Sequence, residues 1–424
     1  MADQATTEDN VTELRPDTGA KAAPEVGGVR DVFQQSIANR LDPKRLGFIL
    51  SAVRQGDSFQ YLLMAEELEE RNLHYRSVLQ TRKLAVQQLP WQIVPASDEA
   101  RDLEIAEMVR ELLNADQIDG LRGHLLDGLA KGWGVAEIDW KQDASAWVPR
   151  QYWHRPAQFF TCARETQQEL RIRTDSAPLY GEEMPAFKFV CHTPRLKVGS
   201  LPRSGLAYAV AAYHVLRNFA IKDWAAFAEV FGMPIRTGTY NAGATEAEKK
   251  ALLSALRKLS TDSVAIFRDG MKMAIEGWGP VSNGEFFEGM ADWFNAEISK
   301  LVLGQTMTTE DGSSLAQAKV HADVRTDIRN ADAIALDRTI DRDLIRPLVD
   351  FNVGPQEQYP RIVTDTAEAE DGAALAAALA PFMDRGLEVS AAEIYERLRL
   401  RQPDGPEDTI RIVPVDTGAE PPPE

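Results

Sequence analysis

Cysteine is nearly absent from this sequence, which contains only Cys162 and Cys191 among 424 residues. Two widely separated thiols make neither a disulfide framework nor a zinc site, and they favour a reducing compartment such as the cytoplasm. No run of about 18 apolar residues occurs, so we predict no transmembrane helix. Residues 1–19 are acidic and lack an apolar core. We therefore expect neither a signal peptide nor contact with a membrane.

The motifs of common enzyme classes are missing as well. The sequence has no GxxxxGK[ST] loop, no GxGxxG turn, no HExxH zinc motif and no GxSxG nucleophile elbow. Its six histidines are scattered, with no pair at metal-ligand spacing. Cys191 and His192 adjoin in a predicted strand, so their side chains point to opposite faces and a buried thiol is preferred to a catalytic dyad. We predict no catalytic residue, no cofactor and no metal ion.

Two pairs of aspartates have a spacing that chemistry could use. Asp323 and Asp327, and likewise Asp337 and Asp341, are four residues apart in a predicted helix. This spacing would suit a metal ion or an acid–base pair, but arginines interleave with both pairs. We therefore favour a solvated face rich in salt bridges. A metal-dependent nuclease built on these four aspartates is the alternative from the enzyme class.

Positive charge is in short supply, because 65 acidic residues outnumber 47 lysines and arginines and give a net charge of −18. A protein that coats DNA needs clustered basic side chains to neutralise phosphates. An acidic wall instead lets a duplex slide past it. One segment, 236–275, is locally basic and predicts a surface for a different partner. Its basic residues are Arg236, Lys249, Lys250, Arg257, Lys258, Arg268 and Lys272.

Hydrophobic periodicity predicts an α+β protein. The first half shows helical spacing at 58–86, 98–114 and 118–131. Short alternating segments predict a small, mostly antiparallel sheet; they lie at 135–140, 146–153, 169–173 and 187–192, with a further short strand at 91–95. The second half predicts three long helices, with Pro347 expected to kink the last; they lie at 204–232, 284–303 and 315–350, and an α/β insert occupies 234–280. Alanine-rich helices are expected beyond residue 365.

A polar loop, 304–314, separates two of these long helices and is rich in Thr, Ser, Gly and Gln. It is either a simple surface connection or a finger that touches sugar–phosphate without holding it. The residues predicted to face DNA are Gln305, Thr306, Thr308, Thr309, Glu310, Asp311, Ser313 and Ser314.

The order of these elements is similar to the core of the phage portal family, and most of the chain resembles its Mu-like branch. The likeness is carried by residues 55–95 with their closing Leu-Pro-Trp, by GWGVAEIDW at 132–140, and by the segments 205–234 and 293–321. It covers about residues 30–350. The resemblance implies a portal fold with an α/β wing, long stem helices, a small α/β clip and a helical C-terminal region.

The resemblance also implies a ring of about twelve copies at one capsid vertex of a virion, assembled in the host cytoplasm. Double-stranded DNA would pass through it, the basic insert would dock terminase and later the head–tail connector, and capsid protein would surround it. The expected division of the chain is a disordered tail 1–30, wing 31–203, first stem helix 204–233, clip 234–283, second stem helix 284–303, tunnel loop 304–314, long helix toward the crown 315–352, and partly disordered crown or tail 353–424. A different phage neck adaptor ring and a cytoplasmic scaffold are the remaining alternatives.

Overall fold

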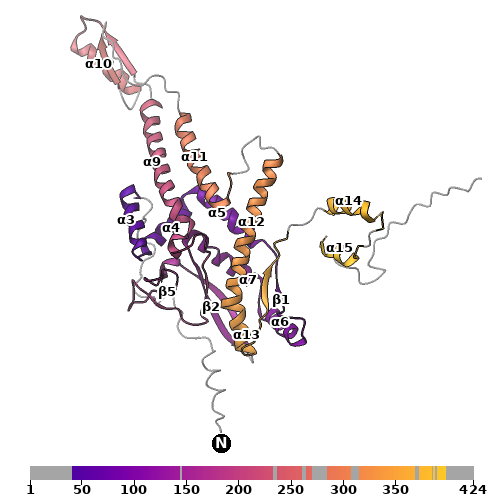
Figure 1. Cartoon of the computed structure of the whole chain (residues 1–424). Helices are drawn as coiled ribbons and strands as arrows, with labels where there is room; N and C mark the ends of the chain where they lie inside the picture. Colours follow the sequence, from indigo (N-terminus) through magenta and orange to yellow (C-terminus); the bar gives the residue numbers. More distant parts are fainter. Residues whose placement is uncertain are drawn as a thin grey trace, which may run out of the picture. The chain divides into compact units, whose positions relative to one another are not determined.

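The structure is a computed structural model, and it describes residues 41–143, 146–232, 236–259, 264–269, 284–306, 315–367, 372–383, 385–386 and 389–397. The chain divides into two compact units, Met1–Asp365 and Thr366–Glu424. Helices and small, mostly antiparallel sheets make up the first unit, so the predicted α+β class is confirmed (Figure 1).

Three helices begin the described part: α3 (Pro43–Arg54), α4 (Phe59–Arg71) and α5 (Leu73–Gln87). The single helix predicted over 58–86 is wrong, because the chain breaks at Asn72. This residue is extended, and its side chain accepts a hydrogen bond from the Tyr75 amide at 3.0 Å. Asparagine is a strong N-cap, so it ends one helix and starts the next at a new angle.

The helices that follow are shorter than predicted. They are α6 (Ala100–Leu112), α7 (Ala115–Leu125) and α8 (Gly128–Lys131), the last two replacing one predicted helix. Glu99 holds the N-cap position of α6. Gly132 ends α8 with a φ of +104°, and a Cβ there would collide with the Leu201 carbonyl oxygen. Only glycine fits this turn between helix and sheet.

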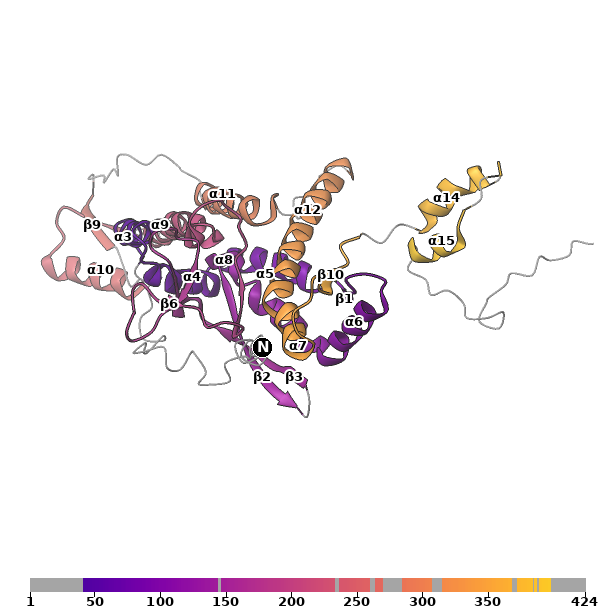
Figure 2. The ribbon, with the colours of Figure 1, turned by 60° about the horizontal axis from the view of Figure 1, so that its bottom comes forward.

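The predicted single sheet is two separate three-stranded antiparallel sheets. One has the order β3-β2-β7, and Figure 2 shows its β2–β3 hairpin; its strands are β2 (Gly134–Asp143), β3 (Ala146–Arg155) and β7 (Phe189–His192). The segment predicted at 169–173 belongs to the other sheet, with β4 (Phe160–Cys162), β5 (Leu170–Ile172) and β6 (Glu182–Glu183). Short 3-10 turns flank this region at η2 (Ala157–Phe159) and η3 (Leu201–Arg203).

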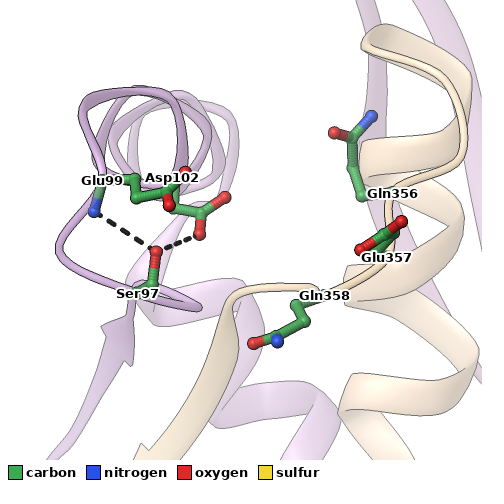
Figure 3. A pocket seen from close by; sticks show the side chains of 6 residues that line it. All are labelled: Ser97, Glu99, Asp102, Gln356, Glu357 and Gln358. Atoms are coloured by element: carbon green, nitrogen blue, oxygen red, sulfur yellow. Dashed lines mark hydrogen bonds between the residues drawn. The ribbon is translucent and has the colours of Figure 1, made fainter.

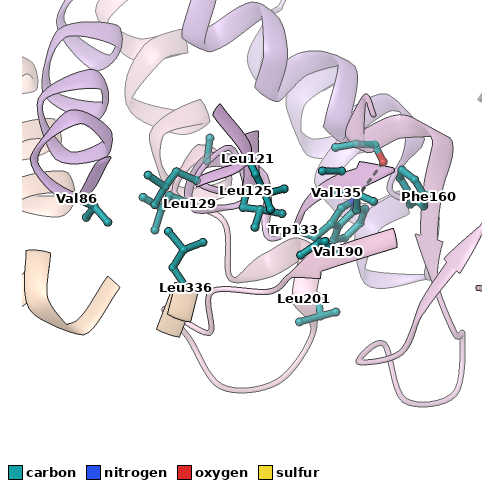
Figure 4. Close-up of a cluster of buried hydrophobic side chains, with 14 of the residues drawn as sticks. Val86, Leu121, Leu125, Leu129, Trp133, Val135, Phe160, Val190, Leu201 and Leu336 are labelled. Atoms are coloured by element: carbon teal, nitrogen blue, oxygen red, sulfur yellow. Dashed lines mark hydrogen bonds between the residues drawn. The ribbon is translucent and has the colours of Figure 1, made fainter. Parts of the chain in front are cut away.

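Trp133 lies at the centre of the core, fully buried between α7, the β3-β2-β7 sheet and Leu201 of η3 (Figure 4). Its indole Nε1–H donates to the Ala157 carbonyl at 3.1 Å, so the one polar atom of the ring is satisfied. Leu336 from the second half of the chain joins the same cluster. The two halves of the first unit therefore share one core.

Two long antiparallel helices, α9 (Leu206–Gly232) and α11 (Gly284–Leu303), frame the insert as predicted. The described insert is a βαβ unit of β8 (Arg236–Tyr240), α10 (Glu246–Leu259) and β9 (Val264–Arg268), with its strands parallel. In Figure 1 it lies at the far ends of α9 and α11. The rest of the predicted insert, residues 270–280, lies outside the described residues.

The last long helix is interrupted. It runs as α12 (Leu315–Ile340), a π-turn labelled η4 (Asp341–Ile345) and α13 (Arg346–Asn352). Pro347 stands in the first turn of α13, directly after the π-turn, and has no N–H to donate to the preceding turn of this continuous helix. The irregularity predicted at Pro347 therefore falls just before it, in the π-turn.

Strand β10 (Arg361–Thr364) was not predicted. It pairs antiparallel with β1 (Trp91–Val94), although the two strands are far apart in the sequence. The second unit contains the expected alanine-rich helices, α14 (Gly372–Met383) and α15 (Ala391–Arg397).

Candidate functional site

The α9–α11 pair is held together by aromatic contacts along its length. Tyr213 on α9 lies 6.0 Å from both Trp293 and Phe294 on α11, ring centre to ring centre. Farther from the body, Phe227 lies 5.6 Å from Phe287. Such pairs stabilise by about 0.5–1.5 kcal/mol beyond the burial of area. The two helices therefore form a continuous hairpin that carries the insert.

The same hairpin exposes large apolar side chains. Trp293 is 53% exposed, Leu216 is 52% exposed and Phe286 is 63% exposed. Phe219, Ile221 and Leu301 are exposed as well. Large exposed apolar surface on a soluble protein marks a place where another surface packs.

The basic residues predicted for the insert are only partly described. Lys250 and Arg268 are exposed, and Lys249 is half-buried with its ammonium 5.0 Å from the Tyr240 ring centre. Lys249 also pairs with Glu246 at 2.7 Å. Arg236, Arg257 and Lys258 lie on β8 and α10, and the structure gives no description of their side chains. Lys272 lies outside the described residues.

The polar loop begins at a tightly packed turn after α11. Gly304 has a φ of +74°, and a Cβ there would lie 2.8 Å from a Val324 methyl group and 2.9 Å from an Ile328 methyl group. Gln305 is 6% exposed in the single chain, and its role toward DNA stays a prediction. Thr306 is half-buried. The other predicted loop residues, at 308–311 and 313–314, lie outside the described residues.

A buried ion pair lies behind this turn. The guanidinium of Arg82, on α5, donates to both carboxylate oxygens of Asp332, on α12, at 2.7 and 3.0 Å. Its third nitrogen donates to the Val302 carbonyl, in the last turn of α11, at 2.8 Å. Arg82 and Asp332 are 8% and 6% exposed. Sequence reasoning missed this cluster because its members lie on three distant helices.

The aspartates of α12 differ from the prediction. Asp323 and Asp327 are exposed, as a solvated face requires. Asp337 is buried, and it accepts hydrogen bonds from the Thr364 hydroxyl at 2.6 Å and the Thr364 amide at 2.8 Å. Asp341 accepts from the Ile362 amide at 2.8 Å. The salt-bridge assignment is therefore wrong for the second pair.

These two carboxylates fasten strand β10 to the helix. Burial raises the pKa of Asp341 to about 6 and raises the pKa of Asp337. Asp343, in the π-turn, fastens strand β7 in the same way, because its carboxylate accepts a hydrogen bond from the Cys191 amide at 2.8 Å. The outer N–H groups of two edge strands are thus covered, which prevents further strands from pairing there.

The buried histidines have structural partners. His192 Nδ1 lies 2.9 Å from the Thr339 hydroxyl, and His214 Nδ1 lies 3.2 Å from the Asn72 amide nitrogen. Cys162 is buried and Cys191 half-buried. Burial raises the pKa of the Cys162 thiol to about 12, which removes it as a nucleophile at neutral pH. Within the described ranges, no three His, Cys, Asp or Glu side chains are placed to hold a metal ion.

A polar pocket of about 300 Å³ lies between the start of α6 and the segment after α13 (Figure 3). It is lined by Ser97, Glu99, Asp102, Gln356, Glu357 and Gln358. The Ser97 hydroxyl donates to Asp102 at 2.5 Å and accepts from the Glu99 amide. These two hydrogen bonds hold the Ser97 side chain within the turn that precedes α6. No described helix has the length and hydropathy to cross a membrane.

Comparison with known proteins gives consistent sequence matches. A family model described as the portal protein of Mu bacteriophage matches residues 62–400. The chain is 32% identical over 398 residues to the portal protein of Escherichia phage Mu, covering 92% of this chain and 77% of that protein. It is 34% identical over 377 residues to the Mu-like prophage FluMu protein gp29 of Haemophilus influenzae, covering 86% and 71%. Among solved structures, it is similar to a chain from the neck of an empty GTA particle computed with C6 symmetry, with 16% identity, a TM-score of 0.47, and coverage of 83% of this chain and 94% of that one.

Proposed function

The chain belongs to the family of the portal protein of Mu bacteriophage, and from that premise we propose that it forms a closed ring at one vertex of a phage capsid. The ring is the channel through which double-stranded DNA is packaged and ejected. About twelve copies build it. It is assembled in the host cytoplasm and remains in the virion.

The exposed apolar side chains of the α9–α11 hairpin are the observation that carries this proposal. Trp293, Leu216 and Phe286 are each more than half exposed in the single chain. Burying such groups stabilises an assembly by about 25 cal/mol for each Å² of apolar surface removed from water. A neighbouring copy of the same hairpin covers them in a ring, where every subunit offers the same surfaces.

The parts of the chain have separate roles in this proposal. The body up to residue 203 is the wing, which meets capsid protein. Helices α9 and α11 are the stem, and the insert between them is the clip. The clip docks terminase during packaging and the head–tail connector afterwards, through exposed basic residues such as Lys250 and Arg268. Helix α12 leads toward the crown, and the chain beyond α13 is the crown or tail.

DNA passage in this proposal is mechanical and electrostatic and includes no bond chemistry. A net charge of −18 weakens attraction between the channel and the phosphates. The loop that follows Thr306 faces the channel and resists backward sliding through transient hydrogen bonds. The buried hydrogen bonds of Asp337 and Asp341 support this reading, because carboxylates that fasten a strand are not free to hold magnesium.

Shortening residues 306–313 to a Gly-Ser linker tests the assignment of the loop. The variant should still form rings, since the packed turn at Gly304 is left intact. Particles that contain it should package or retain less DNA than particles with the unaltered chain. Unchanged DNA content in such particles would contradict the loop assignment. Cleavage of DNA by the purified ring with magnesium would favour the nuclease alternative.

A further inference from the structure

Arg82 connects three helices at the point where the stem meets the body. All three of its guanidinium nitrogens donate hydrogen bonds, two to Asp332 on α12 and one to Val302 on α11. Arginine is planar and holds its five N–H groups in one rigid fork. The direction of α11's last turn is thereby set relative to α12 through a single side chain of α5.

The Val302 carbonyl is one of the last four in α11, which have no partner within the helix. Arg82 supplies that partner in a place where water has no access, since Val302 is fully buried. A second contact holds the same turn, because His74 of α5 lies 2.7 Å from the Ser299 hydroxyl. The end of α11 is therefore attached to α5 at two points.

Asp332 lies where α12 leaves the body of the protein. From this residue onward the helix is largely buried, as Ala333, Leu336 and Ile340 show. Toward its N-terminus, residues such as Asp323 and Asp327 are exposed. In this more exposed part, α12 contacts the turn after α11 through Val324 and Ile328, which lie against Gly304. The Arg82–Asp332 pair is a buried ionic contact between α12 and α5.

We propose that Arg82 is a positioning residue, which sets the angle between the end of α11 and the projecting part of α12. In the assembled ring this angle determines the direction from which both helices approach the channel, and the pair transmits force from that region into the body. Only the statement about the assembled ring rests on the proposed function, and the positioning role within the single chain does not. A buried ion pair adds little net stability over apolar residues of similar size. Fixing the relative positions of the helices is therefore a contribution distinct from stability.

Two variants separate geometry from stability. The double variant Arg82→Met/Asp332→Leu removes both charges, so no buried charge is left unpaired. The single variant Arg82→Lys keeps the charge and loses the fork. A control is Lys83→Met/Glu69→Leu, which removes a neighbouring ion pair between α4 and α5. Lys83 also lies 3.5 Å from Asp127, which keeps Lys131 as a partner in this variant.

The measurement is the distance between spin labels on Cys residues introduced at Lys300 and Asp323, two exposed positions on α11 and α12. Labelled subunits, with Cys162 and Cys191 replaced by alanine, are diluted into unlabelled protein. The labelled protein with the Arg82–Asp332 pair intact should give one narrow distance distribution. Arg82→Met/Asp332→Leu should lose it, Arg82→Lys should widen it, and the control pair should leave it unchanged.

An unchanged distribution in the double variant, or equal widening in the control, would overturn the positioning role. Particles that contain the double variant should also retain less DNA than particles that contain the control. If the unaltered chain forms no ring and enters no particle, the proposed function fails and the distance result still stands. The two ideas therefore fail separately.

Discussion

Two buried histidines should make the folded chain sensitive to acid. The His192 and His214 side chains are almost fully buried, and burial lowers the pKa of His192 to about 3 and of His214 to about 4. For His214 the partners also require a neutral ring. The Asn72 side-chain oxygen caps α5, so its amide nitrogen must donate to Nδ1, which has to be unprotonated.

The sign and size of the effect follow from proton linkage. An unfolded histidine has a pKa of about 6.5, so below that pH the unfolded chain binds protons that the folded chain excludes. The stabilisation is complete above pH 6.5 and is lost as the pH falls toward the folded pKa. At pH 5 the loss is about 2 kcal/mol for each histidine. Asp341, whose pKa is raised to about 6, opposes this by about 1.4 kcal/mol, because its folded form gains the proton first.

Urea unfolding at pH 8, 6 and 5 measures the difference. The unaltered chain should lose a few kcal/mol between pH 8 and pH 5. His214→Gln should start less stable but lose about 2 kcal/mol less over the same range. An equal pH dependence in the variant and the parent would refute the neutral, buried state of His214.

Three further substitutions test other parts of the fold. Gly304→Ala should lower the unfolding free energy by more than about 1 kcal/mol, because the φ of Gly304 is positive and a Cβ there has no room. Gly289→Ala is the control, because a Cβ at Gly289 meets open space and should cause no such loss. Urea unfolding compares the two variants. Asp337→Ala leaves both Thr364 donors without an acceptor and should cost about 1–3 kcal/mol; faster amide hydrogen exchange confined to β10 would be the signature, and unchanged exchange would contradict it. Trp133→Ala empties the centre of the core and should cost about 3–5 kcal/mol; a melting temperature close to the parent's would show that the site collapses.

Periodic features of the sequence were the easiest to predict. The long helices α9 and α11 and the hairpin strands β2 and β3 follow their residue patterns closely, because each buries one face over many residues. The break at Asn72 was missed, although an asparagine three residues before Tyr75 is a capping signal. The apolar spacing simply continued through it.

Features that depend on distant contacts could not be predicted. Strand β10 is four residues long and takes its place from β1 and from the side chains of Asp337 and Asp341. The arginines between those aspartates suggested an exposed face, because sequence spacing does not show which side of the helix meets β10. Arg82 carried no signal at all, since both partners are far away along the chain.

The native mass of the purified protein, with negative-stain images of the same sample, tests the central claim most directly. A closed ring of about twelve subunits with an open centre is the result that the exposed α9–α11 hairpin predicts. A particle of one or two chains at every protein concentration and salt condition, with no ring in the images, would contradict it.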